Sequence, residues 1–228
     1  ELGQTLNRFG IEVTIVEFLP QIMAKEDPDV ADFMLQRLEG EGVRILTSTA
    51  ATRAEDRSGV IHLTLQKSSP GNEISEEIDL ETDVLLIAAG RVPNVESLNL
   101  EAAKVKYDRG GIPVNDYLQT SMPHIYAAGD VAGPYQFTHM ADVQARTVVR
   151  NTLMPLQFLR QKVDYSVVPW STYTSPEVAH VGLGEIDAKQ QNIAYDLYTQ
   201  QMDEVDRAIV ESKEGGFAKV LTEKGSDR

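Results

Sequence analysis

The sequence contains no cysteine. Without thiols, these 228 residues form no disulfide bond and hold no redox-active cysteine pair. Histidine is scarce as well, with four residues that are scattered along the chain. We interpret His62, His124 and His180 as packing or solvent-facing side chains, and we predict no metal site.

Positive charge and long apolar runs are also in short supply. The chain has 21 Lys and Arg residues against 35 Asp and Glu residues, so its formal net charge is −14. This excess repels polyanions, and we expect neither a nucleic acid partner nor binding to an anionic membrane. The longest apolar run, Val84–Ala89, is far shorter than the ~20 residues of a membrane-spanning helix. No signal peptide opens the chain, so we expect a cytoplasmic location.

The apolar pattern of residues 1–46 alternates between helix and strand. Residues 1–9 have the spacing of a helix that starts before residue 1, and 11–16 are β-branched. Asp27-Pro28 is typical of an N-cap followed by proline at the first helical position, and this helix ends near Gly40. The strand at 11–16 is predicted to be the second half of a βαβ unit, and residues 43–46 to form the next strand.

The rest of the chain predicts sheet, loop and helix in turn. The expected elements are an antiparallel meander over 49–80 with a turn at 68–72, a strand buried on both faces at 83–90, a short strand pair around Ile112 and Val114, a strand at 125–128, a helix carrying Met140, Val143 and Val148, a helix at 185–191, and a strand at 216–222 that enters a turn without a returning strand.

The strand at 125–128 ends in the pair Gly129-Asp130, which indicates a flavin site. Glycine lets the backbone approach a ligand closely, and open α/β sheets bind cofactors at the carboxyl ends of their strands. A carboxylate at that place accepts hydrogen bonds from sugar-alcohol hydroxyls. The alternative interpretation of Asp130 is an ordinary turn or helix-capping residue.

Glu17 lies at the end of the strand over 11–16. Dinucleotide-binding folds place there the acid that binds the adenosine ribose through its 2′-hydroxyl. A 2′-phosphate would meet a like charge, and the next basic residue is Lys25, so Glu17 favours NAD(H) over NADP(H). The alternative is a solvated surface carboxylate.

Four segments of the chain resemble the pyridine nucleotide-disulfide oxidoreductases, the flavoprotein family of dihydrolipoamide dehydrogenase, glutathione reductase and mercuric reductase. These segments occur in the family's order and span nearly the whole chain: 1–4 with 13–17, 85–94, 119–131 and 169–182. The resemblance implies the α/β fold class, with FAD/NAD(P)-binding Rossmann-like three-layer domains followed by the start of an α+β dimerisation domain. It divides the chain into the carboxyl part of an NAD-binding domain (1–90), the second half of an FAD-binding domain (91–160) and the start of the dimerisation domain (161–228).

The resemblance also implies roles for individual residues. The turn at Gly90 joins the nucleotide and flavin domains, and Asp130 holds the ribitol chain of FAD. Thr138 and His139 begin a helix whose amino end faces the flavin ring, where backbone N–H groups stabilise negative charge.

Two further residues carry open interpretations. Arg91, in the loop that also contains Asn94, is either a cofactor contact or a structural turn residue. Glu1 matches a family glutamate that lies beside a flavin-proximal lysine, and that lysine is not in this chain.

The resemblance implies an enzyme that passes hydride from nicotinamide to FAD and on to a disulfide or a thiol-bound metal ion, in a homodimer. Similarity is divided between mercuric reductase-like and dihydrolipoamide dehydrogenase-like members. Because these residues hold neither the cysteine pair nor the catalytic histidine, we expect the chain alone to be inactive. The alternative function is a non-catalytic dinucleotide- or FAD-binding module that has lost the dithiol.

Overall fold

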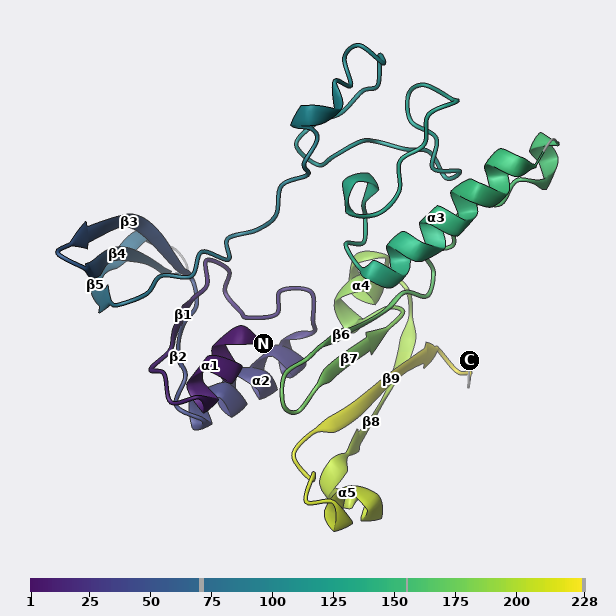
Figure 1. Ribbon diagram of the computed structural model, residues 1–228. Helices are drawn as coiled ribbons and strands as arrows, with labels where there is room; N and C mark the ends of the chain where they lie inside the picture. Colours follow the sequence, from purple (N-terminus) through teal and green to yellow (C-terminus); the bar gives the residue numbers. More distant parts are fainter. Residues whose placement is uncertain (70–71, 155, 227–228) are drawn as a thin grey trace. The chain divides into compact units, whose positions relative to one another are not determined.

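The computed structural model describes residues 1–69, 72–154 and 156–226 (Figure 1). Its internal contacts divide the chain into two compact units. The first unit combines Glu1–Leu86 with Ser171–Arg228, and the second comprises Ile87–Trp170. The first unit is therefore discontinuous in sequence, with the second unit inserted between its two segments.

A small βαβ arrangement forms the amino-terminal part of the first unit. The helix α1 (Leu2–Arg8) is followed by β1 (Thr14–Val16), α2 (Pro28–Gly40) and β2 (Arg44–Leu46), and β1 and β2 pair in parallel. The buried side chains Met34 and Leu38 lie four residues apart on α2 and pack with Val43, as their helical spacing predicts. The predicted alternation of helix and strand is confirmed over this region.

Three long antiparallel strands form the predicted meander. They are β3 (Thr49–Arg57), β4 (Val60–Ser69) and β5 (Asn72–Thr82), in the order β3-β4-β5. Ser58 and Gly59 connect β3 to β4, both with positive φ, as a tight hairpin turn requires. Part of the turn expected at 68–72 lies outside the described residues.

The remaining strands and short helices follow the inserted unit. The strands β6 (Pro169–Thr172) and β7 (Val178–Val181) form one two-stranded sheet, and β8 (Tyr195–Gln201) pairs antiparallel with β9 (Phe217–Glu223). The helix α4 (Glu185–Gln190) precedes β8, and α5 (Asp206–Val210) lies between β8 and β9. The strand expected at 216–222 is confirmed, and its partner is the preceding strand β8.

The second unit is built mainly from loops around a small apolar core and one long helix, α3 (Thr138–Leu153). The described residues also form short 3₁₀ turns: η1 (Glu96–Leu98), η2 (Asp130–Ala132) and η3 (Gln157–Leu159) here, and η4 (Met202–Glu204) in the first unit. The helix α3 confirms the prediction from its apolar spacing.

The two strand predictions for the second unit are wrong. Around Ile112 and at 125–128 the chain makes isolated bridges, Asp108 with Gly111 and Gln119 with Tyr126, but no ladder. A short run of apolar residues predicts a buried segment, and we interpreted these runs as buried strands. Ile112 and Ala127 are indeed buried, but in a core that is formed by turns. Apolar residues alone do not distinguish a buried strand from a buried turn.

The prediction of a doubly buried strand at 83–90 is also wrong. The structure gives these residues no strand, and Val84 and Ile87 are 77% and 79% exposed. A parallel strand needs hydrogen-bonded neighbours on its edges, and the parallel sheet described in this chain contains only β1 and β2.

Candidate functional site

Arg91 and Asp130, two residues predicted to contact a cofactor, meet in the second unit. The guanidinium Nη2 of Arg91 donates to Oδ2 of Asp130 at 2.8 Å, although the residues are 39 positions apart. Both side chains remain partly exposed. They lie in a shallow cleft of about 300 Å³ whose other lining residues are Val92, Pro93, Asn94, Val131 and Gln136.

The turn η2 places Asp130 at the edge of this cleft. Gly129 precedes it with φ +80° and Gly133 follows it with φ +55°, two conformations that favour glycine. The backbone N–H of Ile112 donates to the carbonyl oxygen of Val131 at 2.8 Å, which joins the turn to the apolar core. The carboxylate thus stands on a backbone that is fixed from the side of the core.

Gly90, before Arg91, has φ +115° and gives the chain a sharp change of direction at the start of the second unit. Side chains other than glycine rarely adopt this conformation. The structure therefore requires glycine at the position where sequence analysis expected a turn between domains.

Thr138 and His139 begin α3, as expected. The ring of His139 stacks on that of Phe137, with centroids 5.4 Å apart and an interplanar angle of 9°. Phe137 also stacks with Trp170 at 6.2 Å and with Tyr135 at 6.3 Å. An array of aromatic rings, only partly visible as a pattern in the sequence, therefore surrounds the start of this helix.

Glu17 and Glu1 belong to the first unit and make local or structural contacts there. Oε1 of Glu17 accepts the backbone N–H of Leu19 at 2.7 Å, directly after β1. Oε1 of Glu1 accepts the backbone N–H of Tyr173 at 2.6 Å. Glu17 lies at the end of the strand as predicted, and Glu1 connects α1 to the second segment of the unit.

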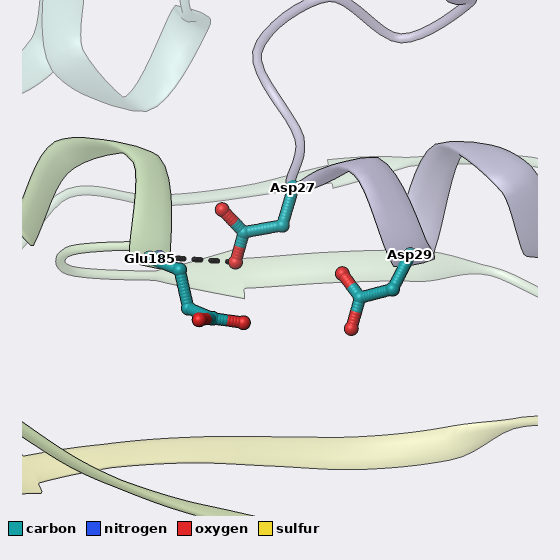
Figure 2. A group of neighbouring side chains, drawn as sticks. All are labelled: Asp27, Asp29 and Glu185. Carbon is teal, nitrogen blue, oxygen red and sulfur yellow. Dashed lines mark hydrogen bonds between the residues drawn. The ribbon is translucent and has the colours of Figure 1, made fainter. Parts of the chain in front are cut away.

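Three carboxylates converge elsewhere in the first unit, at the starts of α2 and α4 (Figure 2). Asp27, Asp29 and Glu185 offer oxygens within 4.8 Å of one another. The ammonium Nζ of Lys219 on β9 lies 2.8 Å from Asp27, 2.8 Å from Asp29 and 3.0 Å from Glu185. The lysine, 9% exposed, thus supplies the cation that these carboxylates surround.

These contacts shift the ionisation of the cluster. Hydrogen bonds from Tyr195 and Lys219 lower the pKa of Glu185 to about 2. Burial alone would raise the pKa of Asp27, but Lys219 and two backbone N–H groups reverse the sign and lower it. Burial opposes the charge of Lys219, yet its three acidic partners raise its pKa. Asp27, Glu185 and Lys219 are therefore ionised at neutral pH.

Asp27 also corrects one expectation from the sequence. Its backbone is at the N-cap position of α2, but its side chain makes no capping bond there. Its two carboxylate oxygens instead accept the backbone N–H groups of Glu185 and Ile186, at 3.0 and 2.9 Å, at the start of α4. The residue caps a helix that lies 158 positions away in sequence.

The sequence profile described as "Pyridine nucleotide-disulphide oxidoreductase" matches residues 1–145, and the profile of the dimerisation domain of the same family matches residues 168–228. The chain belongs to the pyridine nucleotide-disulphide oxidoreductase family. This confirms the resemblance stated from the four sequence segments and the α/β fold class, with a dimerisation domain in the last part of the chain.

Individual members of the family extend this result. The chain is 34% identical over 224 residues to a mercuric reductase of Staphylococcus aureus and 38% identical over 191 residues to a dihydrolipoyl dehydrogenase of Thermus scotoductus. These alignments cover 97% and 83% of this chain but only 39% and 40% of the relatives. The HOCl-induced flavoprotein disulfide reductase RclA from Escherichia coli superposes with a TM-score of 0.83 at 28% identity, over 100% of this chain and 50% of RclA.

The chain thus spans less than half of the length of the curated family members cited above. Within the part of the chain that the structure describes, no helix combines the length and the apolar character needed to cross a membrane.

The sequence did not indicate two residues beside the cleft, Gln144 and Tyr165, of which Gln144 contacts the backbone of Gly129 and the hydroxyl of Tyr165. In the first unit, it did not indicate Lys219. Gln144 carried a weak signal, because a polar residue that interrupts the apolar face of a helix is often buried and hydrogen-bonded. Nothing in the local sequence marked Lys219, since even Glu185, the partner that is nearest in sequence, is 34 positions away.

Proposed function

We propose that this chain is a portion of an FAD-dependent oxidoreductase that transfers hydride from a reduced nicotinamide nucleotide to a disulfide or a thiol-bound metal ion. The observation that carries the proposal is the cleft in which Arg91 and Asp130 meet at 2.8 Å. Family membership supports it, because the relatives cited above include a flavoprotein disulfide reductase, a mercuric reductase and a dihydrolipoyl dehydrogenase.

The residues of the cleft fit the sugar-alcohol part of a flavin nucleotide. Asp130 presents a partly exposed carboxylate that accepts hydroxyl hydrogen bonds, and Gly129 beside it has no side chain to obstruct a ligand. Arg91 neutralises the carboxylate and offers N–H donors to polar ligand atoms. When bound, FAD supplies the hydride-accepting ring of the reaction.

The amino end of α3 supports the same cofactor. Its first backbone N–H groups have no partner inside the helix, and the aligned peptide dipoles favour negative charge there. Thr138 and His139 therefore stabilise the anionic side of a reduced flavin through their backbone rather than their side chains. Gly90 connects this region to the nucleotide-binding part of the chain.

For the other cofactor we propose NAD(H) rather than NADP(H), with Glu17 as the residue that binds the adenosine ribose. The substitution Glu17→Gln removes the charge that repels a 2′-phosphate, so it should raise kcat/KM for NADPH relative to NADH. Steady-state kinetics of the gene product that carries this chain measure this ratio. An unchanged ratio would assign Glu17 only to the turn with Leu19.

The proposed organisation follows from the same reasoning. Residues 1–90 form the carboxyl part of the NAD-binding domain, 91–160 the second half of the FAD-binding domain and 161–228 the start of the dimerisation domain. We propose a cytoplasmic homodimer for the whole protein, with a disulfide or a metal ion as substrate and no nucleic acid or membrane partner. The match to the dimerisation domain supports the dimer.

An anaerobic titration of the whole gene product with NADH, followed by visible absorption, tests the proposal. Loss of the flavin band near ~450 nm with growth of a long-wavelength charge-transfer band supports a disulfide reductase. Loss of the flavin band alone supports a flavoprotein without the dithiol. A protein without any flavin leaves the alternative, a binding module, which the absence of cysteine from these 228 residues keeps open.

A pair of matched variants tests the assignment of the cleft. Asp130→Asn removes a charge from the Arg91 pair, and Asp116→Asn does the same to the Lys162 pair, another exposed ion pair of the second unit. We expect Asp130→Asn to weaken FAD binding and Asp116→Asn to leave it unchanged. Equal FAD affinities in the two variants would contradict the proposed role of Asp130.

A further inference from the structure

Gln144 lies on α3 with none of its surface exposed, and its side-chain amide contacts both ends of the turn that carries Asp130. Its Oε1 accepts the backbone N–H of Gly129 at 2.6 Å. Its Nε2 donates to the carbonyl oxygen of Gly133 at 3.1 Å. The two glycines flank the 3₁₀ turn Asp130–Ala132, so one side chain closes the turn on both sides.

Tyr165 completes the arrangement. The second N–H of Nε2 donates to the hydroxyl oxygen of Tyr165 at 2.9 Å, so both amide hydrogens of Gln144 are used. A flipped amide would direct its NH₂ group at the N–H of Gly129 and its oxygen at the carbonyl of Gly133. The three contacts therefore permit a single orientation of the amide.

We infer that Gln144 is the positioning residue of the flavin site: it sets the direction of the Asp130 carboxylate by holding Gly129 and Gly133 in their positive-φ conformations. This inference rests on the proposed function, since it assigns FAD as the ligand of Asp130. Gln144 acts through the backbone of the turn and does not line the cleft itself. The geometry explains why a fully polar side chain is buried on this helix.

Asn151 provides a matched control on the same helix. It is also fully buried, and its amide also makes two hydrogen bonds, with the backbone of Gln161 at 2.8 and 2.9 Å. These bonds hold the loop at Gln161 rather than the turn at Asp130. Loss of the amide at position 151 therefore controls for loss of a buried amide in general, because only the amide at position 144 contacts the turn at Asp130.

The experiment measures FAD affinity in the whole gene product for Gln144→Leu and Asn151→Leu, after removal and readdition of the cofactor. We expect Gln144→Leu to raise the Kd for FAD by about tenfold or more, the equivalent of one or two hydrogen bonds, with Asn151→Leu close to wild type. If both variants raise the Kd equally, or neither does, the inference is overturned. A wild-type protein without flavin overturns the proposed function and this inference together.

A pH profile separates positioning from packing. In Gln144→Glu the buried carboxyl can still donate one hydrogen bond while it is protonated, and it loses every donor when it ionises. FAD affinity of this variant should therefore fall as pH rises, whereas that of wild type and of Asn151→Leu should not follow the same curve. A flat profile for Gln144→Glu would contradict the inference.

Hydrogen exchange of the cofactor-free protein supplies a readout that does not depend on FAD. The N–H of Gly129 should exchange faster in Gln144→Leu than in wild type, because its acceptor has been removed. It should be unaffected in Asn151→Leu. Unchanged protection of Gly129 in Gln144→Leu would show that other contacts hold the turn, and would overturn the inference even if FAD binds.

Discussion

At the scale of single residues, Gly111 is the most constrained position near the cleft. It has φ +122°, and a Cβ atom built there would lie 2.1 Å from the carbonyl oxygen of Val131. That carbonyl accepts the N–H of Ile112, so it cannot withdraw without loss of a hydrogen bond. A side chain at position 111 must therefore displace the turn that carries Asp130.

We predict that Gly111→Ala lowers the free energy of unfolding by about 2 kcal/mol or more, from the positive φ and the clash together. Urea denaturation measures this loss. Gly110→Ala is the control, because a Cβ at 110 would meet only the flexible carboxylate of Asp108, at 3.1 Å. A loss in Gly110→Ala as large as that in Gly111→Ala would show that the clash with Val131 is not the cause.

The sequence predicted Asp130 and Arg91 as separate candidates, and the structure adds their contact. Asp130 was visible because Gly-Asp after an apolar segment is a local pattern. The pairing of Arg91 with Asp130 joins residues 39 positions apart, and the contact of Gln144 on α3 with Gly129 joins residues 15 positions apart. A local sequence pattern does not encode such contacts. The sequence could thus predict Asp130 and Arg91 as candidate cofactor-binding residues, but not the hydrogen bonds that hold them in place.

At the scale of elements, Lys219 connects β9 to the starts of α2 and α4. We predict that Lys219→Met lowers the free energy of unfolding by about 3 kcal/mol, because it leaves three neighbouring carboxylates without their cation. Urea or thermal denaturation measures the change. Lys213→Met, which removes an exposed lysine 3.5 Å from Glu211, should have little effect.

The same cluster determines a response to acid. The pKa values of Asp27 and Glu185 are lowered by folding, so their contribution to stability is complete above the unfolded pKa values. It is lost as pH falls through the folded pKa values, of which that of Glu185 is about 2. In Lys219→Met this dependence should be weaker, since the main cationic partner is gone. An equally steep loss in both proteins would assign acid sensitivity to other carboxylates.

A histidine on β7, which contacts the segment before α2, gives the opposite dependence. Nδ1 of His180 lies 2.9 Å from Oε2 of Glu26, and Nε2 lies 3.1 Å from the carbonyl oxygen of Gly182. Both ring nitrogens face acceptors, which favours the doubly protonated ring. The hydrogen bond with Glu26 raises the pKa of His180 against the effect of burial, and Asp187 adds to the increase.

We therefore predict that the contribution of His180 is complete below its unfolded pKa of about 6.5 and is lost as pH rises through the higher folded pKa. Compared with wild type, His180→Gln should lose more stability at pH 5.5 than at pH 9, in denaturation curves recorded at both pH values. His124→Gln, at an exposed position, is the control. A difference that is constant with pH would show that His180 stays neutral.

Helices with strong end signals and apolar stripes were predicted well. The bounds of α2 follow from Pro28 and the spacing of Met34 and Leu38, and α3 was found from its apolar face. The segment 83–90 was predicted wrongly. Its apolar composition suits a buried strand, but the described parallel sheet contains only β1 and β2 and gives this segment no neighbouring strand. The composition of a segment gives its preference for strand, but the segment forms a strand only where a neighbouring strand pairs with it.

At the scale of the whole molecule, we predict that residues 1–228 alone catalyse no lipoamide- or mercury-dependent oxidation of NADH. They contain no cysteine to accept electrons from a flavin and pass them to a disulfide or metal ion. The measurement is NADH absorbance with added FAD and each acceptor, with a family member such as a mercuric reductase as the positive control. Substantial turnover by the chain would contradict the prediction.

The family and the α/β class could be predicted from four sequence segments, because these resemble the family's segments, occur in the family's order and span nearly the whole chain. It could not be predicted that the first unit combines two separate segments of the chain. Contacts such as that between Gln4 and Ser175, 171 positions apart, join segments from opposite ends of the chain. No periodicity within either segment reports its partner.

The discontinuity of the first unit has a consequence for synthesis on the ribosome. Asp27 and Asp29 emerge before the inserted unit, whereas Lys219 follows 190 residues after Asp29. While the inserted residues 87–170 are translated, the acidic pair in the preceding segment stays hydrated. The surface of that segment that later packs against residues 171–228 also remains exposed during this time. Completion of the first unit is therefore a late, long-range closure, and cotranslational chaperones would meet this unit in a half-assembled state.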